Sequence, residues 1–400
     1  MIKQAVIFCG GIGSRLQKIT KLIPKPMVQV CGKPFLEHLI IQLKKNGIQE
    51  VILLIGYKGH LIKKYFLDGK NFNIKISYSF LPSEYKTGSR LYKIKSKLNK
   101  KFLLLYCDNY SSINLHKLND KLLKSKKDMI ISLSRKKKGN CKLNKDMTIS
   151  YDFNRNLNNN FVEIGYMILK KEILKKLKKE DENFSDFIGK LSKKKLITGH
   201  IQENGYASIG DSKRLNLTRK LFANNNYILI DRDGVLNHKS KNQRYITKAK
   251  DLNLNKSLCK KLPTTAKLIC ITNQAGLSTK ELSLQSLKKI NFKIKKYLNK
   301  IKLKLEKFYI SHHHFTSKSY FRKPNPGFFL KAAKDFNFIL DKTFYIGDDK
   351  RDIEAAYNAN TFIFYVGKDE LTLEEKKKYN LIILNNTIKK TYNDKKKFRF

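Results

Sequence analysis

The chain has 400 residues, of which 84 are Lys or Arg and 33 are Asp or Glu, so its formal net charge is +51. Hydrophobic residues make up 41%, which is enough for packed cores, and this length suits two domains. No run of 18 apolar residues occurs and the first residues lack a signal-peptide cleavage site, so we expect no transmembrane helix and no secretion.

The positive charge is spread along the whole chain and is carried mostly by lysine. This distribution indicates a compositional bias rather than one nucleic-acid-binding patch, so a nucleic acid partner is not favoured. The same field would still attract phosphate-rich substrates. The six cysteines show no paired spacing, so we expect a cytoplasmic protein without disulfides. Nothing in the sequence indicates an oligomeric state.

The first half of the sequence alternates short apolar segments with amphipathic ones, a pattern typical of an α/β domain. Strands are predicted at residues 3–8, 51–55, 74–79, 102–106 and 161–169, of which 74–79 alternates as a strand near a sheet edge does. Helices are predicted at residues 37–46, 61–66 and 213–222. A glycine-rich segment follows the first strand, where open α/β sheets bind ligands.

This glycine-rich segment, residues 9–16, reads Cys-Gly-Gly-Ile-Gly-Ser-Arg-Leu. Glycines let the backbone approach a phosphate and offer it N–H groups, but such a loop alone occurs in several nucleotide-binding folds. Here Pro-Lys-Pro-Met at 24–27 and Gly-Lys-Pro at 32–34 follow it. The combined pattern resembles the sugar-1-phosphate nucleotidyltransferases, above all the heptose-1-phosphate and mannose-1-phosphate guanylyltransferases.

That resemblance implies that a sugar phosphate attacks the α-phosphorus of a nucleoside triphosphate, with GTP favoured, and releases pyrophosphate. The protein would mainly position the reactants and neutralise charge. Asp108, after the strand at 102–106, would bind Mg²⁺. The residues that the resemblance assigns to the triphosphate are Gly10, Gly11, Gly13, Arg15 and Lys25.

Several positions depart from the family pattern. Ser89 replaces the second glycine of a Thr-Gly-Gly that contacts the base, and the lysine of a Glu-Lys pair is missing at 153–155. Ser208 stands in place of the second metal-binding aspartate, where Asp211 is the nearest substitute. By the same resemblance Glu163 and Gly165 line the sugar site. Because serine is a poor Mg²⁺ ligand, a non-catalytic first domain remains an alternative.

The segment 223–226, Ala-Asn-Asn-Asn, is polar and turn-prone, so we interpret it as a linker between domains at 1–222 and 227–368. In the second domain, strands are predicted at 227–230, 267–272, 343–346 and 361–366, with helices at 282–300 and 329–336. Residues 369–400 form a C-terminal extension, frayed from 393 onward. The predicted fold class is therefore α/β, with two tandem doubly wound, Rossmann-like domains.

Asp231 and Asp233 directly follow the first strand of the second domain and are spaced to point the same way. Two neighbouring carboxylates repel each other unless a cation or a proton lies between them, and Mg²⁺ is the natural partner at a phosphate site. Such a pair suits attack by Asp231 on phosphorus to form an aspartyl-phosphate. Asp233 would protonate the leaving oxygen and then activate water.

Three later motifs accompany this pair: Thr272-Asn273-Gln274, Arg322-Lys323-Pro-Asn-Pro-Gly, and the acidic cluster that starts at Asp348. Together they resemble the motifs of the haloacid dehalogenase (HAD) phosphatases. Their residues are most similar to those of the D,D-heptose 1,7-bisphosphate phosphatases and, less closely, to those of the histidinol-phosphate phosphatases. The resemblance implies Mg²⁺ on Asp231, Asp233 and Asp348. It also implies substrate contacts from Thr272, Asn273, Gln274 and Arg322, and phosphoryl stabilisation by the catalytic Lys323.

The heptose phosphatases usually carry a zinc loop of three Cys and one His before the Arg-Lys-Pro. Here no cysteine follows Cys270, and adjacent histidines at 312–314 cannot easily converge on one ion, so we expect no zinc.

The sequence therefore predicts a bifunctional enzyme of sugar phosphates and a nucleoside triphosphate that supplies a nucleotide-activated heptose for a surface polysaccharide. The alternatives are a phosphatase with a non-catalytic first module, a histidinol-phosphate phosphatase, and a nucleic-acid 3′-phosphatase.

Overall fold

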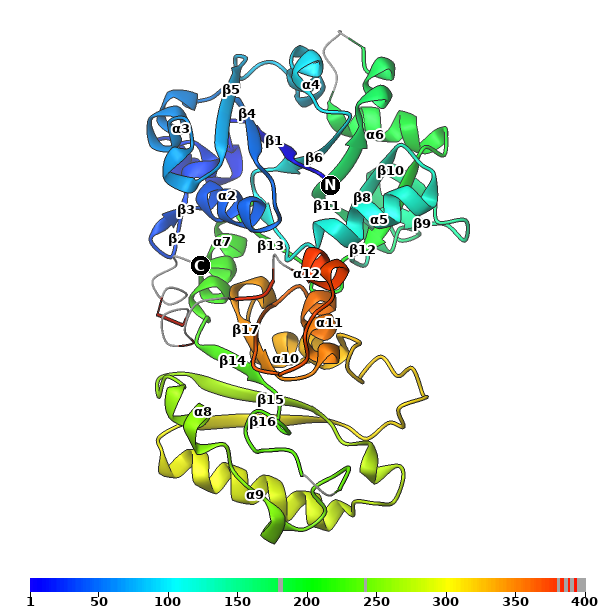
Figure 1. Cartoon of the computed structure of the whole chain (residues 1–400). Helices are drawn as coiled ribbons and strands as arrows, with labels where there is room; N and C mark the ends of the chain where they lie inside the picture. Colours follow the sequence, from blue (N-terminus) through cyan, green and yellow to red (C-terminus); the bar gives the residue numbers. More distant parts are fainter. Residues whose placement is uncertain (179–182, 241–242, 380–381, 385–387, 389–391, 394–400) are drawn as a thin grey trace. The chain divides into compact units, whose positions relative to one another are not determined.

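The computed structural model describes residues 1–178, 183–240, 243–379, 382–384, 388 and 392–393. The chain divides into two compact units, Met1–Lys220 and Leu221–Phe400, which we describe separately (Figure 1). Each unit carries helices on a sheet that contains parallel strands, so the predicted α/β fold class is confirmed.

The strands of unit 1 mostly form one nine-stranded sheet in the described residues. Their bounds are β1 (Gln4–Cys9), β2 (Gln29–Val30), β3 (Lys33–Pro34), β4 (Glu50–Ile55), β5 (Lys75–Phe80), β6 (Lys101–Tyr106), β7 (Asn109–Tyr110), β8 (Met129–Arg135), β9 (Gly139–Leu143), β10 (Ile149–Asn156), β11 (Phe161–Lys170), β12 (Ile197–Ile201) and β13 (Ala207–Ser208). Strands β5, β4, β1 and β6 are parallel neighbours, and β1 is buried at every position, which explains its continuous apolar run. Strand β11 runs antiparallel to β6, so the sheet is mixed.

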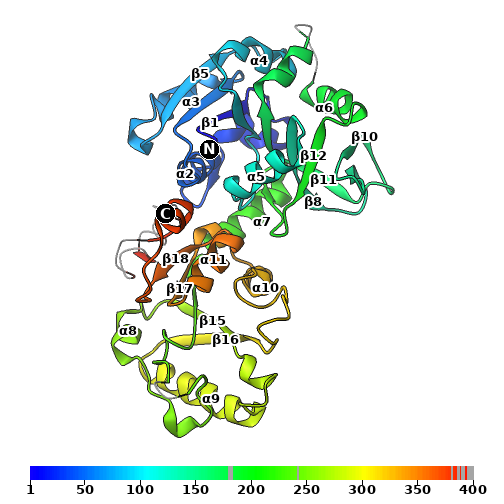
Figure 2. The same ribbon diagram turned by 45° about the vertical axis from the view of Figure 1, so that its right-hand side comes forward.

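The helices of unit 1 cover both faces of this sheet. Their bounds are α1 (Gln17–Thr20), α2 (Phe35–Lys45), α3 (Gly59–Phe66), α4 (Thr87–Lys93), α5 (Leu115–Ser125), α6 (Phe184–Lys193) and α7 (Ser212–Ala223). Leu91 of α4 and Phe184 and Phe187 of α6 share one apolar core with Val6 and Phe8 of β1. Helix α5 packs on β8, β11 and β12 (Figure 2). Helix α7 continues to Ala223, the first residue of the predicted linker.

Unit 2 is built on a parallel sheet of five described strands in the order β16-β15-β14-β17-β18. The strand bounds are β14 (Tyr227–Ile230), β15 (Lys267–Asn273), β16 (Lys304–Ser311), β17 (Phe344–Gly347) and β18 (Phe362–Tyr365). The helices are α8 (Lys256–Lys261), α9 (Leu284–Lys300), α10 (Gly327–Phe336), α11 (Lys350–Ala359) and α12 (Leu373–Tyr379).

Alternate residues of the central strand β14 enter two different cores. Ile228 and Ile230 pack with α9, whereas Leu229 packs with α10 and α11 on the other face (Figure 1). This alternation follows from the two-residue period of a strand. Strands β14, β15 and β17 run parallel, so their carboxyl ends meet at one edge of the sheet. The predicted site residues follow the strands at this edge.

Part of the predicted C-terminal extension packs on unit 2. Ile383 pairs with Ile363 of β18, and Tyr392 is fully buried with its hydroxyl donating to the carbonyl of Thr265 at 3.0 Å. Most of the tail predicted to be frayed, residues 394–400, lies outside the described residues.

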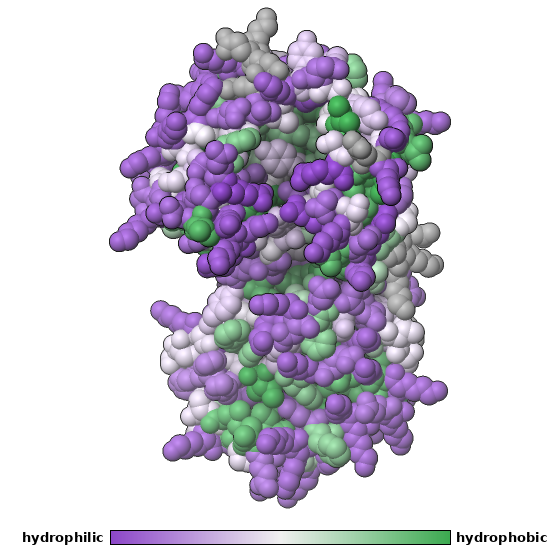
Figure 3. Space-filling view, turned by 180° about the vertical axis from the view of Figure 1, so that it is seen from behind, coloured by the Kyte–Doolittle hydropathy of each residue, from purple (hydrophilic) through white to green (hydrophobic). Residues whose placement is uncertain are grey.

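Hydrophilic side chains cover most of the face that Figure 3 draws, and they spread over both units rather than gathering in one patch. In the described part of the chain, no helix has the length and apolar character needed to span a membrane.

Candidate active sites

Unit 1 contains a cavity of about 460 Å³ at the carboxyl ends of β1 and β6. We call it the glycine-loop cavity, since the loop after β1 forms one wall. All of the residues predicted to bind the triphosphate or its metal line this cavity: Gly10, Gly11, Gly13, Arg15, Lys25 and Asp108. The structure thus brings together residues that lie far apart in the sequence.

Two glycines of the loop have a structural reason to be glycine. A Cβ atom on Gly10 would lie 2.4 Å from the guanidinium carbon of Arg90, and Gly13 has a φ of +72°, which side chains disfavour. Arg90 itself is buried, and its guanidinium donates to the backbone carbonyls of Ile55 at 2.9 Å and Leu81 at 2.7 Å. Sequence reasoning assigned no role to Arg90. The available indication was its position directly after Thr87-Gly88-Ser89.

The ammonium group of Lys25 forms an ion pair with the carboxylate of Asp108. Lys25 was predicted to contact phosphate oxygens and Asp108 to bind Mg²⁺. Because the two groups now neutralise each other, a bound metal and triphosphate would replace this internal contact.

Ser208 lies beside Asp108, as the family pattern implies for the second metal ligand. Strand β13 pairs with β7 so that Ser208 faces Asn109, and the N–H of Ile209 donates to the carbonyl of Asp108 at 3.0 Å. Asp211 instead accepts from the N–H of Arg214 at 2.8 Å and pairs with its guanidinium, so it caps α7. The structure therefore places a serine, not a second aspartate, near Asp108, and the serine hydroxyl accepts from the N–H of Gly210 at 3.1 Å.

Glu163 of β11 does not line the glycine-loop cavity, although the sequence placed it at the sugar site. Its carboxylate accepts from the N–H of Gly165, which has a φ of +81°. Burial, partly offset by that hydrogen bond, raises the pKa of Glu163 to about 8, and nearby Asp108 adds to the increase.

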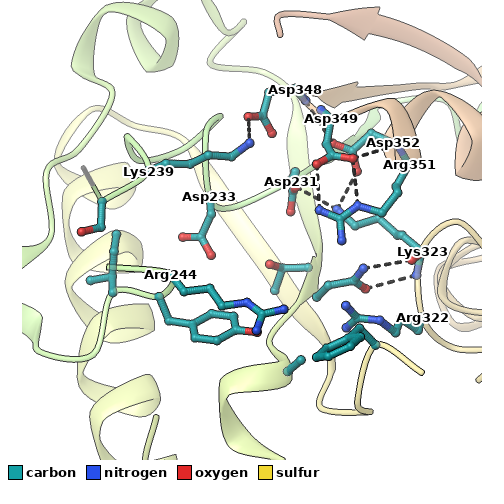
Figure 4. A pocket seen from close by; sticks show the side chains of 17 residues that line it. Asp231, Asp233, Lys239, Arg244, Arg322, Lys323, Asp348, Asp349, Arg351 and Asp352 are labelled. Carbon is teal, nitrogen blue, oxygen red and sulfur yellow. Dashed lines mark hydrogen bonds and ion pairs between the residues drawn. The ribbon is translucent and has the colours of Figure 1, made fainter. Parts of the chain in front are cut away.

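Unit 2 contains a cavity of about 290 Å³ at the carboxyl edge of its sheet, which we call the aspartate cavity (Figure 4). The predicted residues that line it are Asp231, Asp233, Thr272, Asn273, Arg322, Lys323 and Asp348. Gln274 does not line it, but its amide donates to the carboxylate of Asp233 at 2.7 Å.

Three carboxylates converge in this cavity, those of Asp231, Asp348 and Asp352, with oxygens within 4.8 Å of one another. Gly234 makes the convergence possible, because a Cβ atom there would lie 2.0 Å from Oδ2 of Asp348. Its φ of +87° also requires glycine. Oδ1 of Asp348 is buried without a hydrogen-bond partner, as expected of an oxygen that accepts a cation.

Lys323 lies between two of these carboxylates. Its Nζ is 2.8 Å from Oδ2 of Asp231 and 2.7 Å from Oδ1 of Asp352, and it donates to the hydroxyl of Tyr345 at 2.8 Å. These contacts outweigh the cost of burial and raise the pKa of Lys323 above its ordinary range, so the amine stays charged. For the carboxyl group of Asp231, burial has the opposite effect and raises the pKa to about 7, although Lys323 opposes the shift.

Asp233, which the predicted metal set includes with Asp231 and Asp348, is not in this group of three. Its carboxylate accepts from the guanidinium of Arg232 at 2.8 Å and 3.0 Å and from Asn237 at 3.0 Å. Burial alone would raise its pKa, but Arg232 and these hydrogen bonds hold the pKa of Asp233 below the ordinary value. Asp233 is therefore ionised and turned away from Asp348.

The three residues after β15 have mainly positioning contacts. Asn273 donates to the carbonyl of Lys323 at 3.0 Å and accepts from its N–H at 3.1 Å, which fixes the Arg-Lys-Pro loop. The hydroxyl of Thr272 accepts from Gln274 at 3.1 Å. Arg322, predicted to read the sugar phosphate, lines the cavity and donates to the carbonyl of His313 at 3.1 Å.

Sequence reasoning assigned no role to several residues that the structure brings to this cavity. Asp352 accepts from the N–H groups of Asp348 and Asp349 through Oδ2, at 3.0 Å and 3.1 Å, and from Lys323 through Oδ1. Its position one helical turn after Asp348 was the available signal. Lys239, which pairs with Asp348 at 2.6 Å, and Arg244 had no motif that marked them.

The donors fit Mg²⁺, a hard ion that prefers carboxylate oxygens. Asp231 and Asp348 are the best candidate ligands, because Asp352 already accepts from four donors. Elsewhere in the described residues, no other group of three acidic, histidine or cysteine side chains meets the spacing of a metal site. In the predicted zinc-loop region, the rings of His312 and His313 stack on each other with centroids 4.6 Å apart.

Models of two known families each match part of the chain. Residues 4–143 match the family described as nucleotidyl transferase, and residues 226–362 match the family described as polynucleotide kinase 3 phosphatase.

Several curated proteins are similar to part of the chain. A D-glycero-alpha-D-manno-heptose 1-phosphate guanylyltransferase from Campylobacter jejuni is 44% identical over 115 residues, 29% of this chain and 52% of that protein. A guanylyltransferase of the same description from Aneurinibacillus thermoaerophilus is 32% identical over 131 residues, 32% of this chain and 56% of that protein. The chain thus spans about half the length of these relatives.

Among solved structures, HddC from Yersinia pseudotuberculosis has a TM-score of 0.50 and 24% identity, covering 55% of this chain and all of that one. At this identity the likeness supports the fold of unit 1.

Proposed function

We propose that this chain, which joins a nucleotidyltransferase domain to a HAD-like phosphatase domain, performs two steps toward a nucleotide-activated heptose. The phosphatase domain would remove the 7-phosphate of D-glycero-D-manno-heptose 1,7-bisphosphate. The first domain would then couple the heptose 1-phosphate to GTP and release pyrophosphate. The product would supply a surface polysaccharide, such as lipopolysaccharide.

The observation that carries the phosphatase step is the contact of Lys323 with both Asp231 and Asp352 at the bottom of the aspartate cavity. A carboxylate oxygen of Asp231 attacks phosphorus, the bond to the sugar oxygen breaks, and an aspartyl-phosphate forms. Lys323 stabilises the negative charge on the phosphoryl oxygens, and Asp352 and Asn273 keep the lysine and its loop in place.

Asp233 moves the proton in this scheme. As an ionised carboxylate it accepts the proton of the water that hydrolyses the aspartyl-phosphate. The leaving sugar oxygen takes its proton from the carboxyl form of Asp233 in the first step, which leaves the ionised carboxylate that activates water in the second. Arg232, Asn237 and Gln274 hold Asp233 in place between the two steps.

Mg²⁺ would be held by Asp231 and Asp348, where it supplies positive charge that draws a phosphate toward the nucleophile. Lys239, which now pairs with Asp348, would be displaced from that oxygen. The predicted role of Asp233 as a side-chain ligand is not part of this proposal, because Arg232 occupies its carboxylate.

The nucleotidyltransferase step is supported by the glycine-loop cavity and by the Campylobacter jejuni relative, which is itself described as a guanylyltransferase. Gly10, Gly11, Gly13 and Arg15 would hold the triphosphate of GTP, and Lys25 would leave Asp108 to contact it. Asp108 would hold Mg²⁺, with Ser208 as a weak neighbour.

A direct test incubates the whole chain with heptose 1,7-bisphosphate, GTP and Mg²⁺. Phosphate release followed by formation of GDP-heptose supports both steps, and no phosphate release from any sugar phosphate would refute the first. Zinc addition should change nothing. Release of phosphate without consumption of GTP would favour the alternative of a non-catalytic first module. The serine at position 208, in place of a metal-binding aspartate, is the observation behind this alternative.

A second candidate is a nucleic-acid 3′-phosphatase, because the family that matches residues 226–362 is described by that chemistry and the chain has a net charge of +51. Release of phosphate from a 3′-phosphorylated oligonucleotide, faster than from any sugar bisphosphate, would favour it. Histidinol phosphate belongs in the same screen. The six free cysteines support a reducing compartment, so we propose that these reactions take place in the cytoplasm.

A further inference from the structure

Two arginines of the aspartate cavity have no ionic partner in the described residues, although every aspartate of the cavity has one. Asp231 and Asp352 pair with Lys323, Asp348 with Lys239, Asp349 with Arg351, and Asp233 with Arg232. In the described residues, no carboxylate forms an ion pair with the guanidinium group of Arg244 or Arg322, both of which line the cavity. A cavity with two such cations has room for an additional anion.

The two guanidinium groups lie on the same side of the cavity and point toward each other (Figure 4). Burial, together with the charges of Arg351 and Arg244, lowers the pKa of Arg322 below its ordinary value, as expected where like charges are held close together. Like charges repel, so this arrangement is costly unless an anion comes between them. The proposed nucleophile Asp231 pairs with Lys323, and Figure 4 draws it apart from the two guanidinium groups.

Aromatic rings hold Arg244 in this place. Its guanidinium carbon is 4.9 Å from the ring centre of Phe315 and 5.5 Å from that of Tyr245. Both aromatic residues line the cavity, and Phe315 belongs to the segment that the resemblance had associated with zinc. A cation–π stack restricts a long side chain that would otherwise sample many conformations, so the guanidinium is prepared for binding.

We propose that Arg244, held by Phe315, is a specificity-determining residue that binds a second phosphate of the substrate together with Arg322. This inference rests on the proposed phosphatase function and deepens it. The substrate class is a compound with one phosphate at Asp231 and a second at the arginine pair. Arginine suits this task because its planar fork donates two hydrogen bonds to phosphate oxygens.

The test compares hydrolysis of heptose 1,7-bisphosphate with that of heptose 7-phosphate, which lacks the second phosphate. Arg244→Ala should lower the ratio of the two kcat/KM values by about 10- to 100-fold, mainly through KM of the bisphosphate, since a charge-assisted hydrogen bond is lost. Arg244→Lys should keep part of the preference, and Phe315→Leu should lower the ratio less. Arg244 is exposed, so these variants should fold. Lys307→Ala, an exposed lysine outside the cavity, is the control that should change neither reaction.

Binding separates this inference from the proposed function. In the Asp231→Asn chain, calorimetry should show tighter binding of the bisphosphate than of the 7-phosphate, and Arg244→Ala should remove the difference. If Arg244→Ala weakens both ligands equally or neither, the inference is wrong even where the wild-type chain is an active phosphatase. If the wild-type chain releases no phosphate but this binding difference persists, the proposed activity fails and the anion site stands. A 3′-phosphorylated oligonucleotide that loses more affinity than the bisphosphate in Arg244→Ala would overturn the assignment to a small sugar.

Discussion

The two cavities of this chain differ in the groups that line them. The aspartate cavity is built from side chains, with five aspartates that all have cationic partners. The glycine-loop cavity has three glycines of one loop in its wall, and Asp108 with Lys25 forms an ion pair there. A site whose own carboxylate forms a covalent bond needs fixed charges around it, whereas a site that only aligns two substrates needs N–H groups and space.

The largest expected effect tests whether the two cavities work independently. Asp231→Asn removes the proposed nucleophile, so phosphate release should fall by about a thousandfold or more. Pyrophosphate release from GTP and heptose 1-phosphate should be unchanged. Both products can be measured on the same preparation, with Asp335→Asn, an acidic residue paired with Lys331 outside the cavity, as control. Phosphate release that survives Asp231→Asn would rule out this nucleophile.

A smaller effect is expected from Gly234→Ala, which tests how tightly the side-chain-built site is packed. The added methyl group would displace Asp348, so phosphatase activity should fall by about a hundredfold. The positive φ adds a loss of ~1–3 kcal/mol in the free energy of unfolding. Gly205→Ala, which has a φ of +66° and open space around its Cβ position, should cost stability but spare activity. An active Gly234→Ala enzyme would mean that Asp348 is not required.

A further prediction concerns Asp108 of the glycine-loop cavity and tests the effect of adding a carboxylate near it. Ser208→Asp places an acid next to Asp108, so the Mg²⁺ concentration for half-maximal nucleotidyl transfer should fall by about tenfold. The measurement is a Mg²⁺ titration of pyrophosphate release. Ser212→Asp, which adds the same charge at the start of α7, should leave the Mg²⁺ concentration for half-maximal transfer unchanged. An unchanged Mg²⁺ requirement in Ser208→Asp would show that Asp108 suffices alone.

The smallest effect concerns stability and should appear in unit 1 alone. Burial and the nearby Lys121 and Lys117 lower the pKa of His200 to about 4. Between pH 6.5 and 4 the unfolded chain therefore binds a proton at this site that the folded chain does not. The free energy of unfolding should fall on acidification through this window by at most about 3 kcal/mol, since one pKa unit corresponds to ~1.4 kcal/mol.

Denaturation by urea at several pH values checks this prediction. The His200→Gln variant should show a weaker decrease toward acid than the wild-type chain, whereas His60→Gln, at an exposed position, should follow the wild type. Equal slopes in the wild type and His200→Gln would contradict it.

Contiguous motifs made much of both sites predictable. Asp231 and Asp233 adjoin a buried strand, and Gly10, Gly11 and Gly13 lie in one loop, so spacing alone placed them at a sheet edge. Residues that arrive through packing left little signal: Arg90, Asp352 and Arg244 act through neighbours that are distant in sequence. The direction of β11 was also hidden, because a buried strand shows the same apolar run whichever way it runs.

The two hydrogen-bonding neighbours of β14 have a consequence for the order in which the protein matures. Strand β15 follows β14 early in the second unit, but β17 is made much later, and the N–H of Asp231 donates to Ile346 of that late strand at 2.9 Å. A growing polypeptide on the ribosome therefore carries an incomplete nucleophile until most of the second unit has been translated, while the earlier unit can already fold. During synthesis, the proposed nucleotidyl transfer should thus emerge before the proposed cleavage of a phosphate ester.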